Sequence, residues 1–185
     1  MKNTTQSKNI LLGVTASIAA YRACDLITLL REQGYSVRVV MTKDAHAFIT
    51  PLTLQSFSGK EVIEDFFSVP GRVKPVHIEL AKESDLILIA PATADVIAKI
   101  SHGLADDCLT CTVLASDAPL VVAPAMNEKM YHNKFTQENI KRLKDNKARI
   151  VDPIHGHLVC SDQGMGHLAE NSTILKAVKS SLSTK

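Results

Sequence analysis

The segment Asp85-Leu-Ile-Leu-Ile-Ala90, followed by Pro91, is the clearest strand signal in the chain. Its apolar residues run without polar alternation, which is typical of a strand buried on both faces of a parallel sheet. Similar apolar runs occur at 10–14, 35–41, 120–123 and 148–151. Segments with helical spacing of apolar residues separate them, so the sequence predicts a three-layer α/β fold with helices on both faces of the sheet.

Helices are expected where apolar residues recur every three or four positions. They cover 19–30, 44–58 with a disturbance at Pro51, 77–83, 94–102, 106–116, 127–146 and 174–182. Gly34 follows the first helix, where a left-handed glycine commonly ends one. Residues 154–168 hold three glycines and three histidines and are expected to form a long loop, which in a compact domain is usually functional or mobile.

Length and composition exclude several classes of protein. The 185 residues suggest a single domain, 1–185. Lys and Arg total 21 against 19 Asp and Glu, and there is no Trp, which argues against nucleic acid or an anionic membrane as partner. No apolar run approaches the roughly 20 residues of a membrane span. The polar N-terminus and only four cysteines favour a cytoplasmic, reducing location.

Hydroxyl-bearing turns follow three of the expected strands. Thr15-Ala-Ser17 follows the first, Thr42 the second, and Pro91-Ala-Thr-Ala-Asp95 the third. Each alone fits ordinary helix capping. Ligands of open parallel sheets bind at the carboxyl ends of strands, so three such turns on one edge favour a phosphate or flavin pocket. The glycine-rich dinucleotide and Walker A patterns are absent, which removes the best sequence support for NAD and ATP.

Pro124-Ala-Met-Asn127 follows the fourth strand. An asparagine there offers two hydrogen-bond donors and an acceptor in a fixed place. Met126 and Met130 are four residues apart, a spacing that more often fills a core than forms a site.

Four short motifs in this order resemble the flavin-dependent cysteine decarboxylases, and among them the enzymes of coenzyme A biosynthesis. The motifs are His77-Ile-Glu-Leu80, Pro91-Ala-Thr-Ala-Asp95 with the following Gly103-Leu-Ala-Asp-Asp107, Pro124-Ala-Met-Asn-Glu-Lys-Met-Tyr131, and Leu158-Val-Cys-Ser-Asp-Gln-Gly-Met-Gly166. The resemblance covers about residues 10–170. It implies the Rossmann-like or flavodoxin-like form of the α/β sheet.

The resemblance also implies a reaction. FMN would be the cofactor, and 4′-phospho-N-pantothenoylcysteine would be converted to 4′-phosphopantetheine. The thiol would first be oxidised to a thioaldehyde, because a cysteine carboxylate has no electron sink of its own. Loss of CO₂ would then give an enethiol, which reduced flavin and a proton donor convert to the thiol. In such chemistry the protein positions and protonates while the flavin takes the electrons.

The resemblance assigns roles by position. His77 and Cys160 match catalytic residues, Cys160 as the proton donor of the final reduction. Asn127 matches the ligand of the substrate carboxylate, and Met130 an apolar wall beside it. The matching cofactor positions are Ala16, Ser17, Ile18, Thr42, Phe48, Thr93, Ala94, Asp95 and Ala125. No metal is implied. A homotrimer, or an assembly of trimers, with flavin between subunits is expected.

Two departures leave the substrate open. Ser161 replaces a usual glycine, and His167-Leu168 replaces Arg or Ala followed by Met. Both lie in the segment that covers the substrate rather than in the flavin pocket. The alternative is a peptidyl-cysteine oxidative decarboxylase of lantibiotic-type peptide maturation, which shares the flavin, histidine and asparagine motifs. The members of that class that can be compared lack the cysteine at position 160, so Cys160 favours the coenzyme A enzyme.

Three further interpretations are weaker. Cys108 and Cys111 form a C-x-x-C pair, but the neighbouring acidic residues disfavour a thiolate, and packing inside a helix explains the pair better. A zinc site would need His155, His157 and Cys160, whose spacing fits poorly. Some relatives of this family are inhibitory phosphatase subunits, but retention of His77, Asn127 and Cys160 together argues against that role. The chain is expected to be a stand-alone decarboxylase that receives its substrate from a separate ligase.

Overall fold

The computed structural model describes residues 7–66, 75–158 and 161–183, with side chains between 157 and 163 left out. Its main sheet has five parallel strands in the order β2-β1-β3-β4-β5. They are β1 (Asn9–Val14), β2 (Ser36–Met41), β3 (Leu86–Ala92), β4 (Leu120–Pro124) and β5 (Arg149–Ile150). The predicted parallel sheet is therefore confirmed, and its strand order is that of the flavodoxin-like fold.

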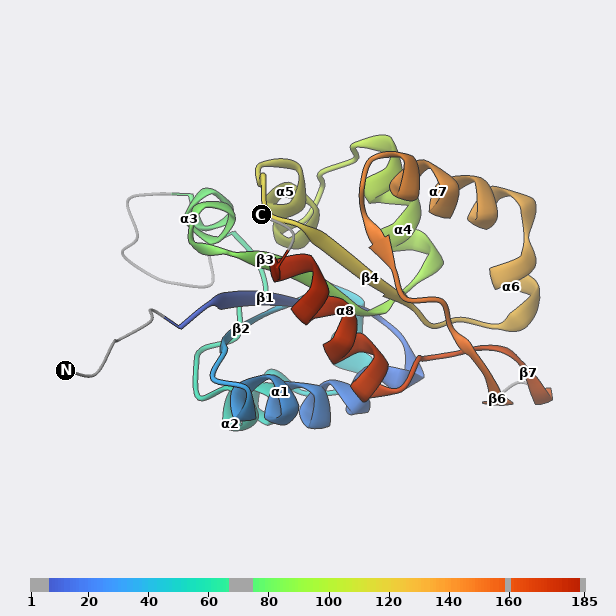
Figure 1. Ribbon diagram of the computed structural model, residues 1–185, viewed down its shortest axis with the longest axis horizontal. Helices are drawn as coiled ribbons and strands as arrows, with labels where there is room; N and C mark the ends of the chain where they lie inside the picture. The colour runs from blue at the N-terminus through green and yellow to red at the C-terminus, as the bar shows by residue number, and fades with distance from the viewer. Residues whose placement is uncertain (1–6, 67–74, 159–160, 184–185) are drawn as a thin grey trace.

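Helices cover both faces of the sheet (Figure 1). One face carries α1 (Arg22–Glu32), α2 (Pro51–Ser58) and α8 (Asn171–Ser183). The other carries α3 (Val76–Glu83), α4 (Ala94–His102), α5 (Cys108–Leu114) and α7 (Lys134–Asp145). Among the described helices, none is both long and apolar enough to cross a membrane.

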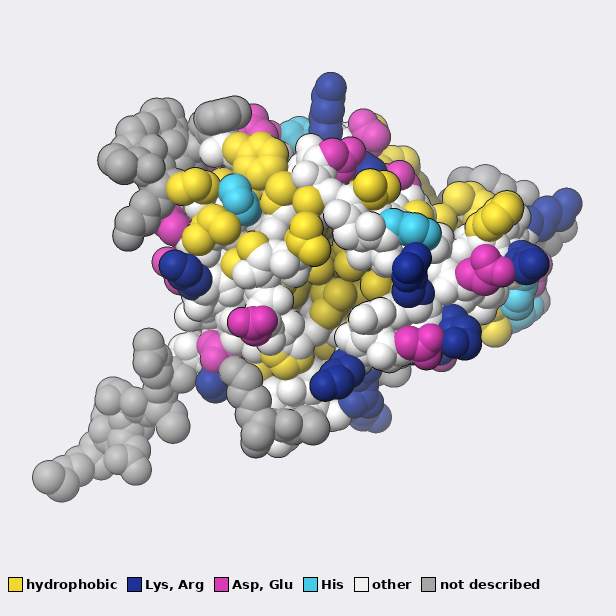
Figure 2. Space-filling model, turned by 90° about the horizontal axis from the view of Figure 1, so that it is seen from above, with side chains coloured by type: hydrophobic (Ala, Val, Ile, Leu, Met, Phe, Trp, Pro, Cys, Tyr) yellow, Lys and Arg dark blue, Asp and Glu magenta, His cyan; other side chains and the backbone are white. Residues whose placement is uncertain are grey.

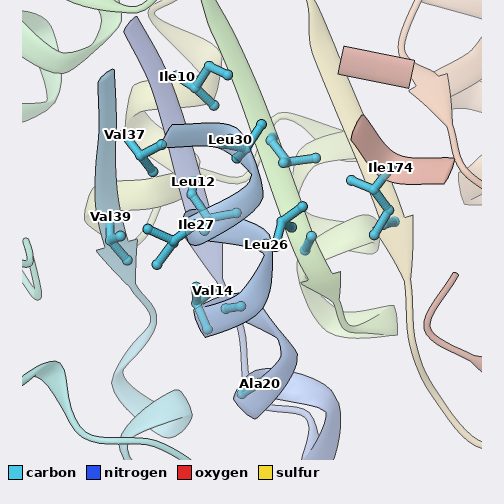
Figure 3. Packing of buried hydrophobic residues seen from close by; sticks show 14 of the residues in the cluster. Ile10, Leu12, Val14, Ala20, Leu26, Ile27, Leu30, Val37, Val39 and Ile174 are labelled. Atoms are coloured by element: carbon cyan, nitrogen blue, oxygen red, sulfur yellow. The ribbon is translucent and has the colours of Figure 1, made fainter. Parts of the chain in front are cut away.

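The strands bury both of their faces. Alternate residues of β1 enter opposite cores: Ile10, Leu12 and Val14 pack under α1, whereas Leu11 joins the core under α3, α4 and α5. Figure 3 shows the first core, where Leu26 and other α1 side chains lie on β1 and β2. Each fully buried Leu, Ile or Val contributes about 1.5–3 kcal/mol, so this core fixes the strand ends on which the site is built.

Two predicted helices are divided in the structure. The segment expected over 44–58 is a 3₁₀ helix, η2 (Lys43–Ala47), followed by α2, because Pro51 occupies the first turn and Thr50 caps it. The segment expected over 127–146 is α6 (Glu128–His132) followed by α7, with Asn133 capping the second helix. The first expected helix begins as a separate 3₁₀ turn, η1 (Ile18–Tyr21), before α1.

The expectation of a long loop over 154–168 is wrong. The segment forms an antiparallel hairpin of β6 (Ile154–Leu158) and β7 (Ser161–His167), separate from the main sheet. Its glycines interrupt the alternation of apolar and polar residues from which a strand is predicted. The hairpin docks outside the main sheet, where the Met126 N–H donates to the Gly166 carbonyl at 3.0 Å. Strands β3 and β4 also continue through Pro91 and Pro124, the prolines expected to end them, because a proline is tolerated where no ladder N–H is needed.

Candidate functional site

A cavity of about 610 Å³ lies at the carboxyl edge of the sheet. Its walls come from the segments that follow β1, β2, β3 and β4, and from the foot of the hairpin, defined here as residues 166–168. The neighbouring strands β1 and β3 mark the point where the strand order reverses, which is where open α/β sheets bind ligands. Of the predicted site residues, those lining it are Ala16, Ser17, Ile18, Phe48, Thr93, Ala94, Ala125, Asn127 and Met130.

A buried threonine joins the two strand ends beneath this cavity. Thr15 is 0% exposed, and its hydroxyl donates to the Pro91 carbonyl at 2.7 Å. The same oxygen accepts a hydrogen bond from the Thr93 backbone N–H at 3.0 Å. Thr15 therefore fixes the loop after β1 beside the loop after β3. In the sequence Thr15 was noted only as part of the hydroxyl-bearing turn after the first strand, and its bridging role was not predicted.

Two hydroxyl caps face the cavity from these loops. Ser17 caps η1 by accepting from the Ala19 N–H, and Thr93 caps α4 by accepting from the Val96 N–H. Each hydroxyl still has its own proton to donate. The start of α4 carries the positive end of the helix dipole, so this end of the cavity suits an anionic group.

Asn127 presents a free amide nitrogen at the end of β4. Its Oδ1 accepts from the Lys129 N–H at 2.9 Å, which caps α6 and fixes the side chain. Its Nδ2 makes no hydrogen bond to any residue that the structure describes. Met130, one turn further along α6, also lines the cavity. The pair offers a fixed N–H donor beside an apolar wall, an arrangement able to hold a carboxylate.

The hairpin foot is fastened from two sides. Gly166 has φ +143°, and a Cβ added there would lie 2.1 Å from the Met126 carbonyl oxygen. On the other side, Arg22 donates from Nη1 to the Leu168 carbonyl and from Nη2 to Glu170, both at 2.9 Å. These contacts hold His167 and its neighbours against the cavity.

Three of the predicted site residues that the structure describes are not among those lining the cavity. His77 lies on α3, which Figure 1 places far from α6 and the hairpin. Its ring meets Phe66 edge-on at 5.3 Å, and its buried Nδ1 has no partner among the described residues. Thr42 precedes η2, and Asp95 points to solvent and pairs with Lys99 at 3.5 Å. Cys160 lies outside the described residues.

The sequence matches the Flavoprotein family over residues 1–183. The chain belongs to this family. Relatives include the Coenzyme A biosynthesis bifunctional protein CoaBC of Vibrio vulnificus, 49% identical over 167 residues, which are 90% of this chain and 42% of that protein. The CoaBC of Escherichia coli is 43% identical over 168 residues, 91% of this chain and 41% of that protein. The chain thus spans less than half the length of these relatives.

Solved structures of two decarboxylases confirm the fold. A PPC decarboxylase mutant complexed with pantothenoylaminoethenethiol superposes with a TM-score of 0.85 and 34% identity, covering 94% of this chain and 97% of that chain. The FMN-dependent cysteine decarboxylase SpaF superposes with a TM-score of 0.80 and 32% identity, covering 94% and 98%. The family resemblance predicted from the four motifs is therefore confirmed.

This flavoprotein also has a larger hollow, of about 1000 Å³, at the amino-terminal ends of β3 and β4. Hydrophobic side chains form its floor between the helices of that face (Figure 2). It contains none of the predicted site residues, and it lies at the edge of the sheet opposite to the one where parallel sheets bind ligands. We therefore assign the site to the smaller cavity.

The paired cysteines lie on α5 and favour the protonated form. Burial raises the pKa of Cys108 to about 11, with a further contribution from the charge of Asp107. Burial also raises the pKa of Cys111, and Asp107 and Asp106 add to the shift. A redox dithiol needs an accessible thiolate, so these shifts argue against that role for this pair.

Proposed function

We propose that this flavoprotein binds FMN in the 610 Å³ cavity and converts 4′-phospho-N-pantothenoylcysteine to 4′-phosphopantetheine, a step of coenzyme A biosynthesis. One observation carries the proposal: the cavity gathers the loops after four strands around the free amide of Asn127. The CoaBC relatives and the PPC decarboxylase structure support the same reaction.

The lining of the cavity fits FMN. Small apolar side chains, Ala16, Ala94 and Ala125, leave room for a flat ring system. The hydroxyls of Ser17 and Thr93 stand at helix starts and would hold an anionic phosphate. When bound there, FMN would supply the oxidation of the substrate thiol to a thioaldehyde and the later reduction of the enethiol.

The protein's own groups would position the substrate and handle its protons. Asn127 would donate its Nδ2–H to the carboxylate that leaves as CO₂, and Met130 would shield that carboxylate from water. The electron pair of the broken C–C bond would pass into the adjacent thioaldehyde. Cys160 is the proposed proton donor when the enethiol is reduced to the thiol. His77 is the proposed catalytic histidine of the oxidative decarboxylation.

We propose that the site is completed between subunits of a homotrimer or an assembly of trimers. His77 is not among the residues lining its own chain's cavity, so it would reach the site of a neighbouring copy. Ile18 and Tyr21, at the cavity, are 58% and 60% exposed, which suits a surface covered by another subunit. Gel filtration showing a stable active monomer would contradict this assembly.

We also propose that 1–185 is one flavoprotein domain, a view that the family match over 1–183 supports. The proposed location is the cytoplasm, because cysteines are sparse in the sequence. Neither nucleic acid nor membrane is proposed as a partner, because the net charge is only +2.

The direct test is to purify the protein, record its absorbance and assay the substrate. The protein should be yellow with a flavin spectrum, and should release CO₂ from 4′-phospho-N-pantothenoylcysteine while forming 4′-phosphopantetheine. Cys160→Ser should still release CO₂ but accumulate the enethiol, whereas Cys24→Ser on α1 should behave as wild type. Full product from Cys160→Ser would show that the role given to Cys160 is wrong.

The second candidate is oxidative decarboxylation of peptides ending in cysteine. The structural similarity to SpaF, at 32% sequence identity, supports this second candidate. A yellow protein that leaves phosphopantothenoylcysteine untouched but modifies such peptides would establish this alternative. A colourless protein that cannot be reconstituted with FMN would exclude both.

A further inference from the structure

Most polar side chains that line the cavity are already engaged by the protein. The oxygens of Ser17 and Thr93 accept bonds from helix N–H groups. The guanidinium of Arg22 donates to the Leu168 carbonyl and pairs with Glu170, and only 13% of the Arg22 side chain is exposed. Arg22 aside, the side-chain nitrogens of the described lining residues that have no partner among the described residues are Nδ2 of Asn127 and Nε2 of His167.

His167 is held in one orientation by its surroundings. Its Nδ1 lies 3.0 Å from the carbonyl oxygen of Leu168, so Nδ1 carries the proton and donates it. Its Cβ packs over Gly156, where an added Cβ would come within 3.1 Å. The hydrogen bonds of the hairpin foot fix the backbone on either side. In the neutral ring, Nε2 is then left as an acceptor.

We propose that His167 is a specificity-determining residue, whose Nε2 accepts a hydrogen bond from an N–H or O–H of the acyl group on the substrate's cysteine. The inference rests on the proposed function, in which Asn127 holds the cysteine carboxylate. The two candidate substrates share that carboxylate and differ in their acyl groups. A residue that contacts the acyl group therefore decides between them.

The identity of the side chain at this position supports the inference. An arginine at this position could only donate hydrogen bonds, and an alanine could form none through its side chain. A histidine with its Nδ1 engaged is an acceptor, so it selects a different feature of the acyl group.

The test compares His167→Ala, which removes the acceptor, with His167→Gln, which keeps an amide oxygen. His102→Ala, at the exposed end of α4, is the matched control. Each holoenzyme is titrated with FMN and then assayed for CO₂ release from 4′-phospho-N-pantothenoylcysteine. All variants should bind FMN within about twofold of wild type. His167→Ala should raise KM about three- to tenfold with kcat nearly unchanged, and His167→Gln should recover most of that loss.

Several results would overturn the proposal. An unchanged KM in His167→Ala would show that the ring does not contact the substrate. A parallel loss of FMN affinity would assign the residue to the cofactor instead. Equal KM values for the Gln and Ala variants would show that shape, and not an acceptor, matters. A flavin-loaded wild type that decarboxylates no N-acylcysteine would refute the proposed function, and this inference with it.

Discussion

Replacing Gly166 by alanine gives the sharpest test of how the cavity is built, because the added Cβ would collide with a backbone atom of the β4–α6 loop. A Cβ at this position would lie 2.1 Å from the Met126 carbonyl oxygen, and Cβ contacts under 3.0 Å essentially never occur. The hairpin foot or the β4–α6 loop must therefore move by about 1 Å. The hydrogen bond from Met126 N–H to the Gly166 carbonyl, 3.0 Å long, would be lost with that movement.

The cost can be estimated from these contacts. Placing a Cβ at a φ of +143° costs about 1 kcal/mol, the lost hydrogen bond about 1 kcal/mol, and the collision about 1–3 kcal/mol. We expect Gly166→Ala to lower the free energy of unfolding by about 3–5 kcal/mol. Gly34→Ala is the matched control, because Gly34 also has a positive φ, +83°, but an added Cβ there meets nothing within 4 Å. Its cost should be about 1 kcal/mol.

Urea denaturation followed by circular dichroism measures both free energies, and Tm should fall by about 2–4 °C for each kcal/mol. Gly166→Ala should also raise KM for the acylcysteine, because Asn127 follows Met126 directly. Gly34→Ala should leave KM unchanged. Equal losses of stability in the two variants, with an unchanged KM in both, would refute the view that the hairpin foot is docked on the β4–α6 loop.

Two further predictions concern buried groups. Thr15→Val leaves the Pro91 carbonyl and the Thr93 N–H unpaired, so it should lower the free energy of urea unfolding by about 2–4 kcal/mol and weaken FMN binding at least tenfold. Thr15→Ser should retain both the stability and the FMN affinity. A wild-type FMN affinity in Thr15→Val would contradict this role. Cys108, whose pKa is raised from 9.0 to about 11, should react with iodoacetamide at pH 8 about 100-fold more slowly in the native chain than when unfolded. Because mainly the unfolded thiol ionises between pH 9 and 11, the contribution of Cys108 to stability should be constant below pH 8 and decline above pH 9, a decline that Cys108→Ala should remove.

The sheet could be predicted because its signal is local. Each strand is an apolar run, and burial on both faces requires that pattern, as the two cores on either side of β1 show. The carboxyl-edge site follows from the same reading, because parallel strands all end at one edge. The hairpin could not be predicted this way, since its two strands pair only with each other and its docking depends on backbone contacts such as that of Gly166 with Met126.

The positions of the predicted site residues in the fold were harder to predict from the sequence than the sheet. Asp95 lies on the first turn of α4, yet its side chain points to solvent and pairs with Lys99, because only part of a helix turn can face one cavity. His77 could not be placed from sequence, since its distance from the cavity depends on how α3 packs on the sheet. The bridging role of Thr15 was not predicted, because it depends on the pairing of β1 with β3, in which Ile10 lies opposite Leu86, 76 residues later in the chain.

The strand-end loops and the hairpin foot, which together form the cavity wall, are fixed by different contacts. The strand-end loops are fixed by the core and by the Thr15 bridge, so the groups proposed to bind the cofactor have little freedom to move. The hairpin foot is held by hydrogen bonds from Arg22 on one side and Met126 on the other, and of its three residues Leu168 is buried in the hydrophobic core. Under the proposed role of His167, substitutions in the foot would change which acyl group is accepted without disturbing the flavin loops.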